Sequence, residues 1–266
     1  MMGTVGATGH IDLHCHVLPA IDDGPATIAG SLAFARAAQA AGIVTLVAKP
    51  HVNPGHPEND PVRIAERVGK VRAALRAEGI GVDVVAGAEV ALARALALDD
   101  ATLASLHLGG GPWLLLECPL GPAGAPGFVE AAREVAARGH RIVLAHPERS
   151  PAFHADPEGT LAPLVEEGMV AQVTAGALVG RFGRKPREVA LRLLHAGLIH
   201  DVASDGHDAL GRVPSIGPEL EAAGFGAQAP WLAGDVPAAI LSGAELPPPP
   251  PFPDPQPSGW RRLLPR

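Results

Sequence analysis

Two histidines near the N-terminus have the spacing of metal ligands on a β-strand. Side chains alternate across a strand, so in the run 11–16 the rings of His14 and His16 point to one side and Cys15 points to the other. Two imidazoles on one strand can bind a single transition-metal ion. A lone His-x-His is a weak signal, but this chain carries further groups of that chemistry at or just beyond the ends of later apolar runs.

The candidate metal donors are histidines and carboxylates. They are His14, His16, Asp23, His51, Glu89, Glu117, His146, Asp205 and His207. One ion usually takes about four to six ligands, so this set suits two or three ions, an arrangement that can hold both the attacking and the leaving oxygen of a phosphoester. Mixed nitrogen and oxygen ligation without thiolate favours manganese, iron or zinc. We prefer Asp23 as the ligand and Asp22 as a loop or capping residue, and the choice between the two stays open.

Some of these residues also fit a structure without metal. His51 follows a proline and could be a turn residue. Glu89 and Glu117 end apolar runs, where an unpaired buried carboxylate is costly, so each needs a cation nearby. An arginine could supply that charge instead of a metal ion. The recurrence of donors at most strand ends favours the metal.

Composition excludes several classes of function. The formal net charge is −7 with no basic block, so nucleic acid is not an expected partner. Two cysteines make no disulfide framework and no paired-cysteine zinc site. The chain has no apolar run of about 18 residues and no secretory signal, so we expect no membrane insertion and a cytoplasmic protein.

Short apolar runs alternate with alanine-rich helical stretches along the chain. Strands are expected at 10–15, 43–48, 82–86, 113–118, 141–145, 170–174 and 199–203. Helices are expected at 31–41, 60–78, 91–105, 126–138, 160–167 and 186–196. Several of these helices end in glycine, the residue best suited to the left-handed position after a helix. Seven strands separated by helices predict parallel βα units.

The placement of the donors distinguishes a closed barrel from an open sheet. A barrel brings the C-terminal ends of all its strands onto one rim, whereas an open sheet spreads them along a line. Because donors follow almost every strand, we predict one barrel-like (β/α) domain over residues 1–246. Residues 247–266 contain the run PPPPPFPDPQP and are expected to form an extended proline-rich tail, whose role the sequence does not reveal.

Several ordered segments resemble a known superfamily. They are HCH at 14–16, KPH at 49–51, GAE at 87–89, AHPER at 145–149 and SDGH at 204–207. In this order they resemble the motifs of the polymerase-and-histidinol-phosphatase (PHP) superfamily. Within it, IDLHCHVLPAIDDG at 11–24 and SDGHDALGRVPS at 204–215 are most similar to the manganese-dependent protein-tyrosine phosphatases of bacterial capsule and exopolysaccharide operons, the CpsB/CapC-like family.

The resemblance implies a distorted (β/α)7 TIM-like barrel with a metal site at the C-terminal ends of the strands. It assigns His14, His16, Glu89 and Asp205 to one ion; Glu89, Glu117 and His146 to a second, with Glu89 bridging; and Asp23, His51 and His207 to a third. It also implies that Arg149 and Arg212 clamp the phosphoryl oxygens, for which a planar guanidinium is well suited. Lys49 and Gly206 depart from the residue types usual in such sequences.

The predicted function is hydrolysis of phosphotyrosine in proteins by a metal-activated hydroxide, with manganese as the expected metal and Arg149 and Arg212 stabilising the developing charge. The resemblance implies the tyrosine-rich tail of a bacterial tyrosine kinase as substrate and a role in exopolysaccharide or capsule synthesis. The general acid and the oligomeric state stay open. One alternative is a PHP-type small-molecule phosphatase, such as one acting on histidinol phosphate. Another is a non-catalytic binding module, although nine retained donors argue against it.

Overall fold

Seven parallel strands occupy the positions that the sequence predicts. The structure is a computed structural model and describes residues 9–254. The strands are β1 (His10–Cys15), β2 (Ile43–Ala48), β4 (Asp83–Ala86), β6 (Trp113–Glu117), β7 (Arg141–Ala145), β8 (Val170–Thr174) and β9 (Asp201–Ala203). Two short strands, β3 (His51–Val52) and β5 (Glu89–Ala91), continue β2 and β4 after a break. Each strand pairs with its neighbours in parallel.

The barrel is distorted because its ladder is interrupted. One sheet has the order β1-β2-β4 and the other has the order β3-β5-β6-β7-β8-β9, so the chain passes from one sheet to the other at Lys49-Pro50 and again at Gly87-Ala88. Pro50 has no N–H to offer to a ladder. On the other side, the Asp205 amide donates to the His14 carbonyl at 2.9 Å, and the His16 amide donates to the Gly206 carbonyl at 2.8 Å. These bonds join the end of β9 to β1 without a continuous ladder.

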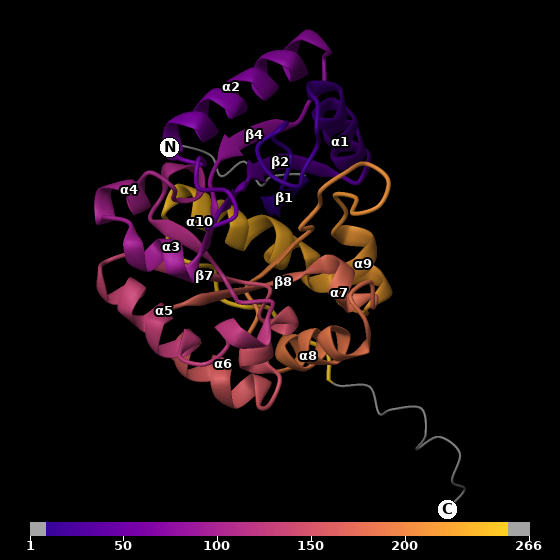
Figure 1. Ribbon diagram of the computed structural model, residues 1–266. Helices are drawn as coiled ribbons and strands as arrows, with labels where there is room; N and C mark the ends of the chain where they lie inside the picture. Colours follow the sequence, from indigo (N-terminus) through magenta and orange to yellow (C-terminus); the bar gives the residue numbers. More distant parts are fainter. Residues whose placement is uncertain (1–8, 255–266) are drawn as a thin grey trace, which may run out of the picture.

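Helices surround the strands (Figure 1). Those matching predictions are α1 (Ile28–Ala40), α2 (Pro61–Ala77), α5 (Phe128–Ala137), α6 (Pro157–Glu166) and α8 (Arg184–His195). Local signals explain two of the starts: Asp60 caps α2 ahead of Pro61, and Asp156 caps α6 ahead of Pro157.

The helical prediction was wrong in two respects. The helix expected at 91–105 is split into α3 (Leu92–Ala97) and α4 (Asp100–Ala104), because Asp99 accepts a hydrogen bond from the Thr102 amide and starts a new helix. Besides short 3-10 helices, three α-helices and one π-helix were not predicted: α7 (Ala175–Leu178), α9 (Gly217–Ala222), α10 (Val236–Ser242) and the π-helix Trp231–Asp235. They are short and lie in the segment where glycine and proline obscure the helical period.

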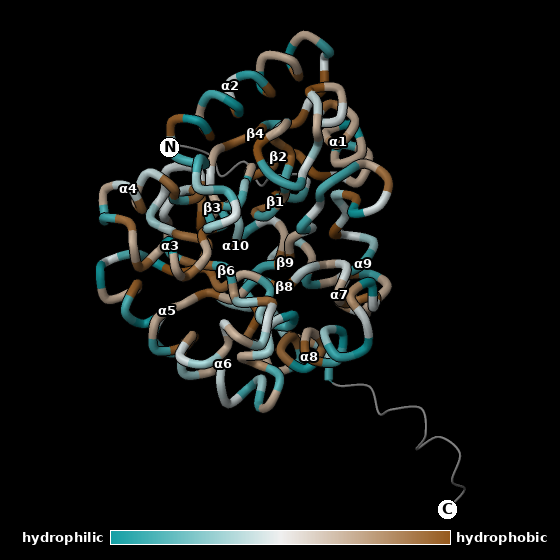
Figure 2. Tube along the Cα trace, viewed as in Figure 1, coloured by the Kyte–Doolittle hydropathy of each residue, from teal (hydrophilic) through white to brown (hydrophobic). Residues whose placement is uncertain are grey.

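The apolar core lies between the strands and the helices. Leu114, Leu116 and Leu144 are fully buried, as are Phe34 and Leu193 on the surrounding helices. Hydropathy along the trace follows this arrangement, with apolar strands inside and polar residues on the outer helices (Figure 2). No helix within residues 9–254 combines the length and the apolar character needed to cross a bilayer.

The first part of the proline-rich segment packs against the domain. Residues 247–254 have no regular secondary structure. The Trp231 indole donates to the Pro247 carbonyl at 3.1 Å, and the Gln228 amide donates to the Pro251 carbonyl at 2.7 Å. The Phe252 ring lies 6.0 Å from that of Trp231. The rest of the expected tail, 255–266, lies outside the described residues, and the domain boundary at 246 stays a prediction.

Candidate metal centre

The structure brings all nine predicted donors together at the C-terminal ends of the strands. They fall into four overlapping groups whose ligand atoms lie within 4.8 Å of one another. The groups are His16, Asp23, His51 and His207; His14, Glu89 and His146; His14, His16 and Asp205; and His51, Glu89 and Glu117. His16 therefore shares a group with Asp23, His51 and His207, which the family-based division between three ions does not include.

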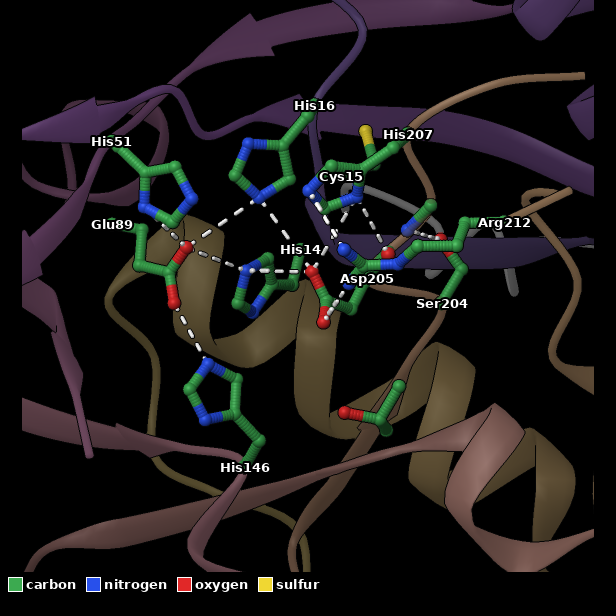
Figure 3. Close-up of polar contacts among 12 residues, drawn as sticks. His14, Cys15, His16, His51, Glu89, His146, Ser204, Asp205, His207 and Arg212 are labelled. Atoms are coloured by element: carbon green, nitrogen blue, oxygen red, sulfur yellow. Dashed lines mark hydrogen bonds and ion pairs between the residues drawn. The ribbon is translucent and has the colours of Figure 1, made fainter. Parts of the chain in front are cut away.

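Glu89 lies at the centre of this cluster (Figure 3). Its Oε2 is 3.2 Å from His14 Nε2, 3.4 Å from His16 Nε2 and 3.2 Å from His51 Nδ1. Its Oε1 is 2.8 Å from His146 Nε2. Since β5 is the short strand that restarts after Gly87-Ala88, the break places this carboxylate where four histidines from three other chain segments converge. That position suits a bridging ligand.

The donor set fits divalent cations. His14 Nε2, His16 Nε2 and His51 Nδ1 are buried without a hydrogen-bond partner among the described residues, and each lies near a carboxylate oxygen. Burial, together with the charge of Glu89, raises the pKa of Glu117 to about 8. Buried carboxylates that repel one another need a cation between them. Mixed imidazole and carboxylate donors suit manganese, iron and zinc.

The structure separates Asp22 from Asp23. Asp23 Oδ1 lies 3.2 Å from His207 Nε2 and 3.6 Å from His51 Nε2, and it belongs to a donor group. Hydrogen bonding to His207 holds the pKa of Asp23 well below its usual range. Asp22 instead accepts from His16 Nδ1 at 2.7 Å and from the His51 amide at 3.2 Å. Asp22 therefore holds the His16 ring and the His51 backbone from behind, while Asp23 faces the donors.

Two of the donors have left-handed backbone conformations. His146 has φ 40° and Asp205 has φ 49°, and within residues 9–254 Ala20 is the one other non-glycine residue with positive φ. Such conformations cost about 1–3 kcal/mol each and persist where surrounding structure holds them. Here the His146 amide donates to the Gln172 carbonyl at 2.8 Å, and the Asp205 amide donates to the backbone carbonyl of His14 at 2.9 Å. The adjacent strands thus impose the backbone turn that directs each side chain into the site.

Arg149 and Arg212 meet beside the donors. Both guanidinium groups donate to Asp205 Oδ2, Arg212 at 2.5 Å. Both also lie near the ring of Phe182, with the Arg149 Cζ atom 4.3 Å and the Arg212 Cζ atom 5.8 Å from its centroid. Phe182 was not singled out in the sequence, where a lone aromatic residue between two predicted elements gives no signal. Arg149 forms an ion pair with Asp205.

A small cavity opens between the donors and the arginines. It measures about 90 Å³, and Asp23, His51, Glu117, Arg149 and Arg212 are among the residues that line it. That space suits an anion of phosphoryl size.

Below the donors, the barrel interior contains a polar layer that sequence reasoning missed. Asp12, Lys49 and Asp201 have no exposed surface, and Gln172 is 1% exposed. Burial lowers the pKa of Lys49 to about 7 and raises that of Asp201 to about 7. The available signal was positional: Asp12 lies two residues before His14, on the same face of β1. Charged residues inside an apolar strand are costly unless partnered, so the pattern indicated a buried network.

The two cysteines lie outside the donor groups. Cys15 and Cys118 are fully buried, and burial raises the pKa of each thiol well above its usual range. The Cys15 thiol donates to the Val47 carbonyl at 3.5 Å. A thiol of raised pKa carries little of the nucleophilic thiolate at neutral pH.

Comparisons with known proteins agree with the family that the motifs indicate. Residues 10–223 match the family described as capsular polysaccharide synthesis, CpsB/CapC. Tyrosine-protein phosphatase YwqE of Bacillus subtilis is 38% identical over 199 residues, covering 74% of this chain and 77% of that protein. The putative tyrosine-protein phosphatase CapC of Staphylococcus aureus is 26% identical over 203 residues, covering 76% and 78% of the two chains.

A solved structure shows the same fold. It comes from crystal structures of YwqE from Bacillus subtilis and CpsB from Streptococcus pneumoniae, described as unique metal-dependent tyrosine phosphatases. It superposes on this chain with a TM-score of 0.77 at 32% identity and covers 92% of this chain and 100% of the other. The match over residues 10–223 includes all nine donors and both arginines. This chain therefore belongs to the CpsB/CapC family of capsular polysaccharide synthesis.

Proposed function

We propose that this chain is a metal-dependent protein-tyrosine phosphatase. The observation that carries the proposal is the convergence of nine nitrogen and oxygen donors beside two arginines, around one cavity of phosphoryl size. Burying several carboxylates beside imidazole nitrogens that lack hydrogen-bond partners is energetically costly unless cations bind between them. The names of the two relatives and the description of the solved structure support the same activity.

The donors would hold two or three divalent ions, with manganese as the first choice and iron or zinc as alternatives. We propose that Glu89 bridges two ions and that Asp23, rather than Asp22, is a ligand. When bound, such ions lower the pKa of a coordinated water so that hydroxide is available near neutral pH to attack phosphorus. Asp22 accepts the Nδ1–H of His16 and so leaves the Nε2 lone pair of that ring directed into the site.

Arg149 and Arg212 would bind the phosphoryl oxygens. Their guanidinium groups already line the cavity and share Asp205 Oδ2 as acceptor, so each retains N–H groups that can turn to an incoming anion. The Phe182 ring lies against the guanidinium groups of both arginines and limits their movement. Charge develops on the transferred group in the transition state, which is where fixed donors contribute most. The leaving phenolate has a conjugate-acid pKa of about 10, so it needs less protonation than an alkoxide.

We further propose that the substrate is a phosphotyrosine protein of the capsule or exopolysaccharide system, such as the tyrosine-rich tail of a bacterial tyrosine kinase, and that the enzyme acts in the cytoplasm. The family description supports the connection to capsule synthesis. The cavity between the donors and the arginines can receive the phosphoryl group of such a substrate. A flexible protein tail can present such a group.

Parallel assays test the proposal. Purified protein should hydrolyse a phosphotyrosine peptide faster than histidinol phosphate, lose activity in EDTA and regain it with Mn²⁺. His14→Ala with His16→Ala should abolish both activity and metal binding, whereas Arg133→Ala, in a surface pair with Glu167, should change neither. Less than one equivalent of metal after Mn²⁺ addition, or full activity in EDTA, would contradict the metal mechanism. Preference for histidinol phosphate would indicate a small-molecule phosphatase instead.

A further inference from the structure

A buried hydrogen-bonded chain lies directly behind His14. His14 Nδ1 is 2.8 Å from Gln172 Oε1, and Gln172 Nε2 donates to Asp201 Oδ2. Gln172 lies in β8 beside Asp201, the first residue of β9, in the pairing of these strands. All three side chains are at most 1% exposed. The His14 ring is therefore held from the side opposite to its Nε2, which faces Glu89 and Asp205 (Figure 3).

The chemistry of the three groups fixes the direction of these bonds. In the structure the Gln172 amide turns its NH₂ to Asp201 Oδ2 and its carbonyl oxygen to His14 Nδ1. A carbonyl oxygen only accepts, so His14 Nδ1 must carry the proton. In a neutral imidazole the second nitrogen then has its lone pair free, and this nitrogen is Nε2.

We propose that Gln172 is a positioning residue for the metal centre: oriented by Asp201, it holds His14 as the Nδ1–H tautomer with Nε2 directed at the ions. The inference rests on the proposed metal function. A ligand histidine whose second nitrogen is hydrogen-bonded keeps one ring orientation, and loss of such a partner typically costs about 10- to 100-fold in metal affinity.

The other histidines of the site provide a comparison within the same molecule. Asp22 accepts from His16 Nδ1 at 2.7 Å, so His14 in β1 and His16 just after it are both fixed from behind, His16 by a carboxylate and His14 by an amide. His146 differs, because its Nδ1 is buried without a hydrogen-bond partner among the described residues. A change at Gln172 should therefore act on His14 and leave the rings of His16 and His146 as they are.

Three variants separate positioning from simple filling of the barrel interior. Gln172→Met keeps the approximate volume and removes the acceptor. Gln172→Glu keeps an acceptor oxygen that can face His14 and can share one proton with Asp201. Val173→Ala is the matched control, because it lies next along β8, points to the opposite face and is equally buried. Each variant is loaded with Zn²⁺, a diamagnetic probe, and its affinity is measured by competition with a chromophoric chelator.

We expect Gln172→Met to weaken Zn²⁺ binding by about 10- to 100-fold, while Gln172→Glu and Val173→Ala stay within a few-fold of the wild type. Long-range ¹H–¹⁵N spectra of the zinc-loaded wild type should show His14 with a slowly exchanging Nδ1–H and a metal-bound Nε2. In Gln172→Met the His14 proton should exchange rapidly, while that of His16 is retained.

Each result has a defined meaning. Zinc bound to His14 through Nδ1 in the wild type would overturn the inference without any variant, even if Gln172→Met fails to fold. Unchanged affinity and unchanged His14 exchange in Gln172→Met would also overturn it, and would leave the metal centre itself intact. Failure of the wild type to bind Zn²⁺ would refute the proposed metal function instead.

Discussion

Replacing Arg149 tests the proposed phosphate pocket apart from the metal centre. The Arg149 guanidinium donates to Asp205 Oδ2 and lies over the Phe182 ring. In Arg149→Ala, Asp205 keeps its bond to Arg212 at 2.5 Å, so the ligand cluster retains a partner and metal content should not change. Loss of a charge-assisted contact made in the transition state costs about 2.7–4 kcal/mol, which corresponds to roughly 10²–10³ in kcat.

Conservative and neighbouring variants sharpen this test. Arg149→Lys should recover little activity, because an ammonium cannot reproduce the planar pair of donors. Phe182→Leu leaves both arginines in place and removes their aromatic support, a contact of about 0.5–2 kcal/mol, so a loss of roughly 2- to 30-fold is expected. Arg133→Ala is the matched control, since this arginine binds Glu167 on the surface.

The assays are steady-state hydrolysis of a phosphotyrosine peptide, inhibition by vanadate and elemental analysis of each variant. The expected pattern is a large fall in kcat/KM, weaker vanadate inhibition and unchanged metal content in Arg149→Ala. Wild-type kcat/KM and vanadate inhibition would show that Arg149 serves only to hold Asp205. A loss of metal with the loss of activity would place the arginine in the support of the ligands.

Three further predictions follow from the site and the core. Asp23→Asn should lower the metal content, because Asp23 belongs to a donor group. Asp22→Asn should leave the metal content unchanged, because the asparagine oxygen can still accept from His16 Nδ1. Elemental analysis of the two variants measures both effects. Cys15→Ser combined with Cys118→Ser should retain most phosphatase activity, and a complete loss in a folded double variant would indicate a thiol nucleophile. Burial lowers the pKa of His200 from 6.5 to about 4, so the unfolded chain binds the proton more tightly and stability falls as the pH drops through that window. Between pH 7 and pH 5 the wild type should lose about 2 kcal/mol more than His200→Leu in denaturant titrations, and equal losses would contradict the assignment.

The strands could be predicted because each is a short apolar run bounded by glycine, proline or a polar donor. The run 113–118 and the strand Trp113–Glu117 differ by one residue, and the other six agree to within two residues. The interruption of β2 and β4 could not be predicted in the same way. Pro50 alone is compatible with a loop, and only the pairing of His51 with Glu89 shows that the chain resumes as a strand after the break.

The nine donors could be predicted because polar residues at the ends of apolar strands stand out, and because their order matches a known set of motifs. Their division among ions could not, since it depends on distances across the barrel. Asp22 and Asp23 illustrate the difference. The two carboxylates are adjacent and chemically identical, and only the turn of the loop decides which one faces His207 and which one lies behind His16.

The interior layer shows where prediction from sequence ends and why. Asp12 and His14 alternate along β1 and His16 follows just after it, so the periodicity that identified the histidines applies equally to the aspartate. What the strand could not reveal was the partner: Asp12 accepts from the Ser204 amide at 3.0 Å, across 192 residues of sequence. Gln172 and Asp201 likewise acquire a role only when β8 and β9 lie beside β1. Because these partners come from the strands that surround the gap in the ladder, metal binding and the closure of the barrel should depend on the same buried hydrogen bonds.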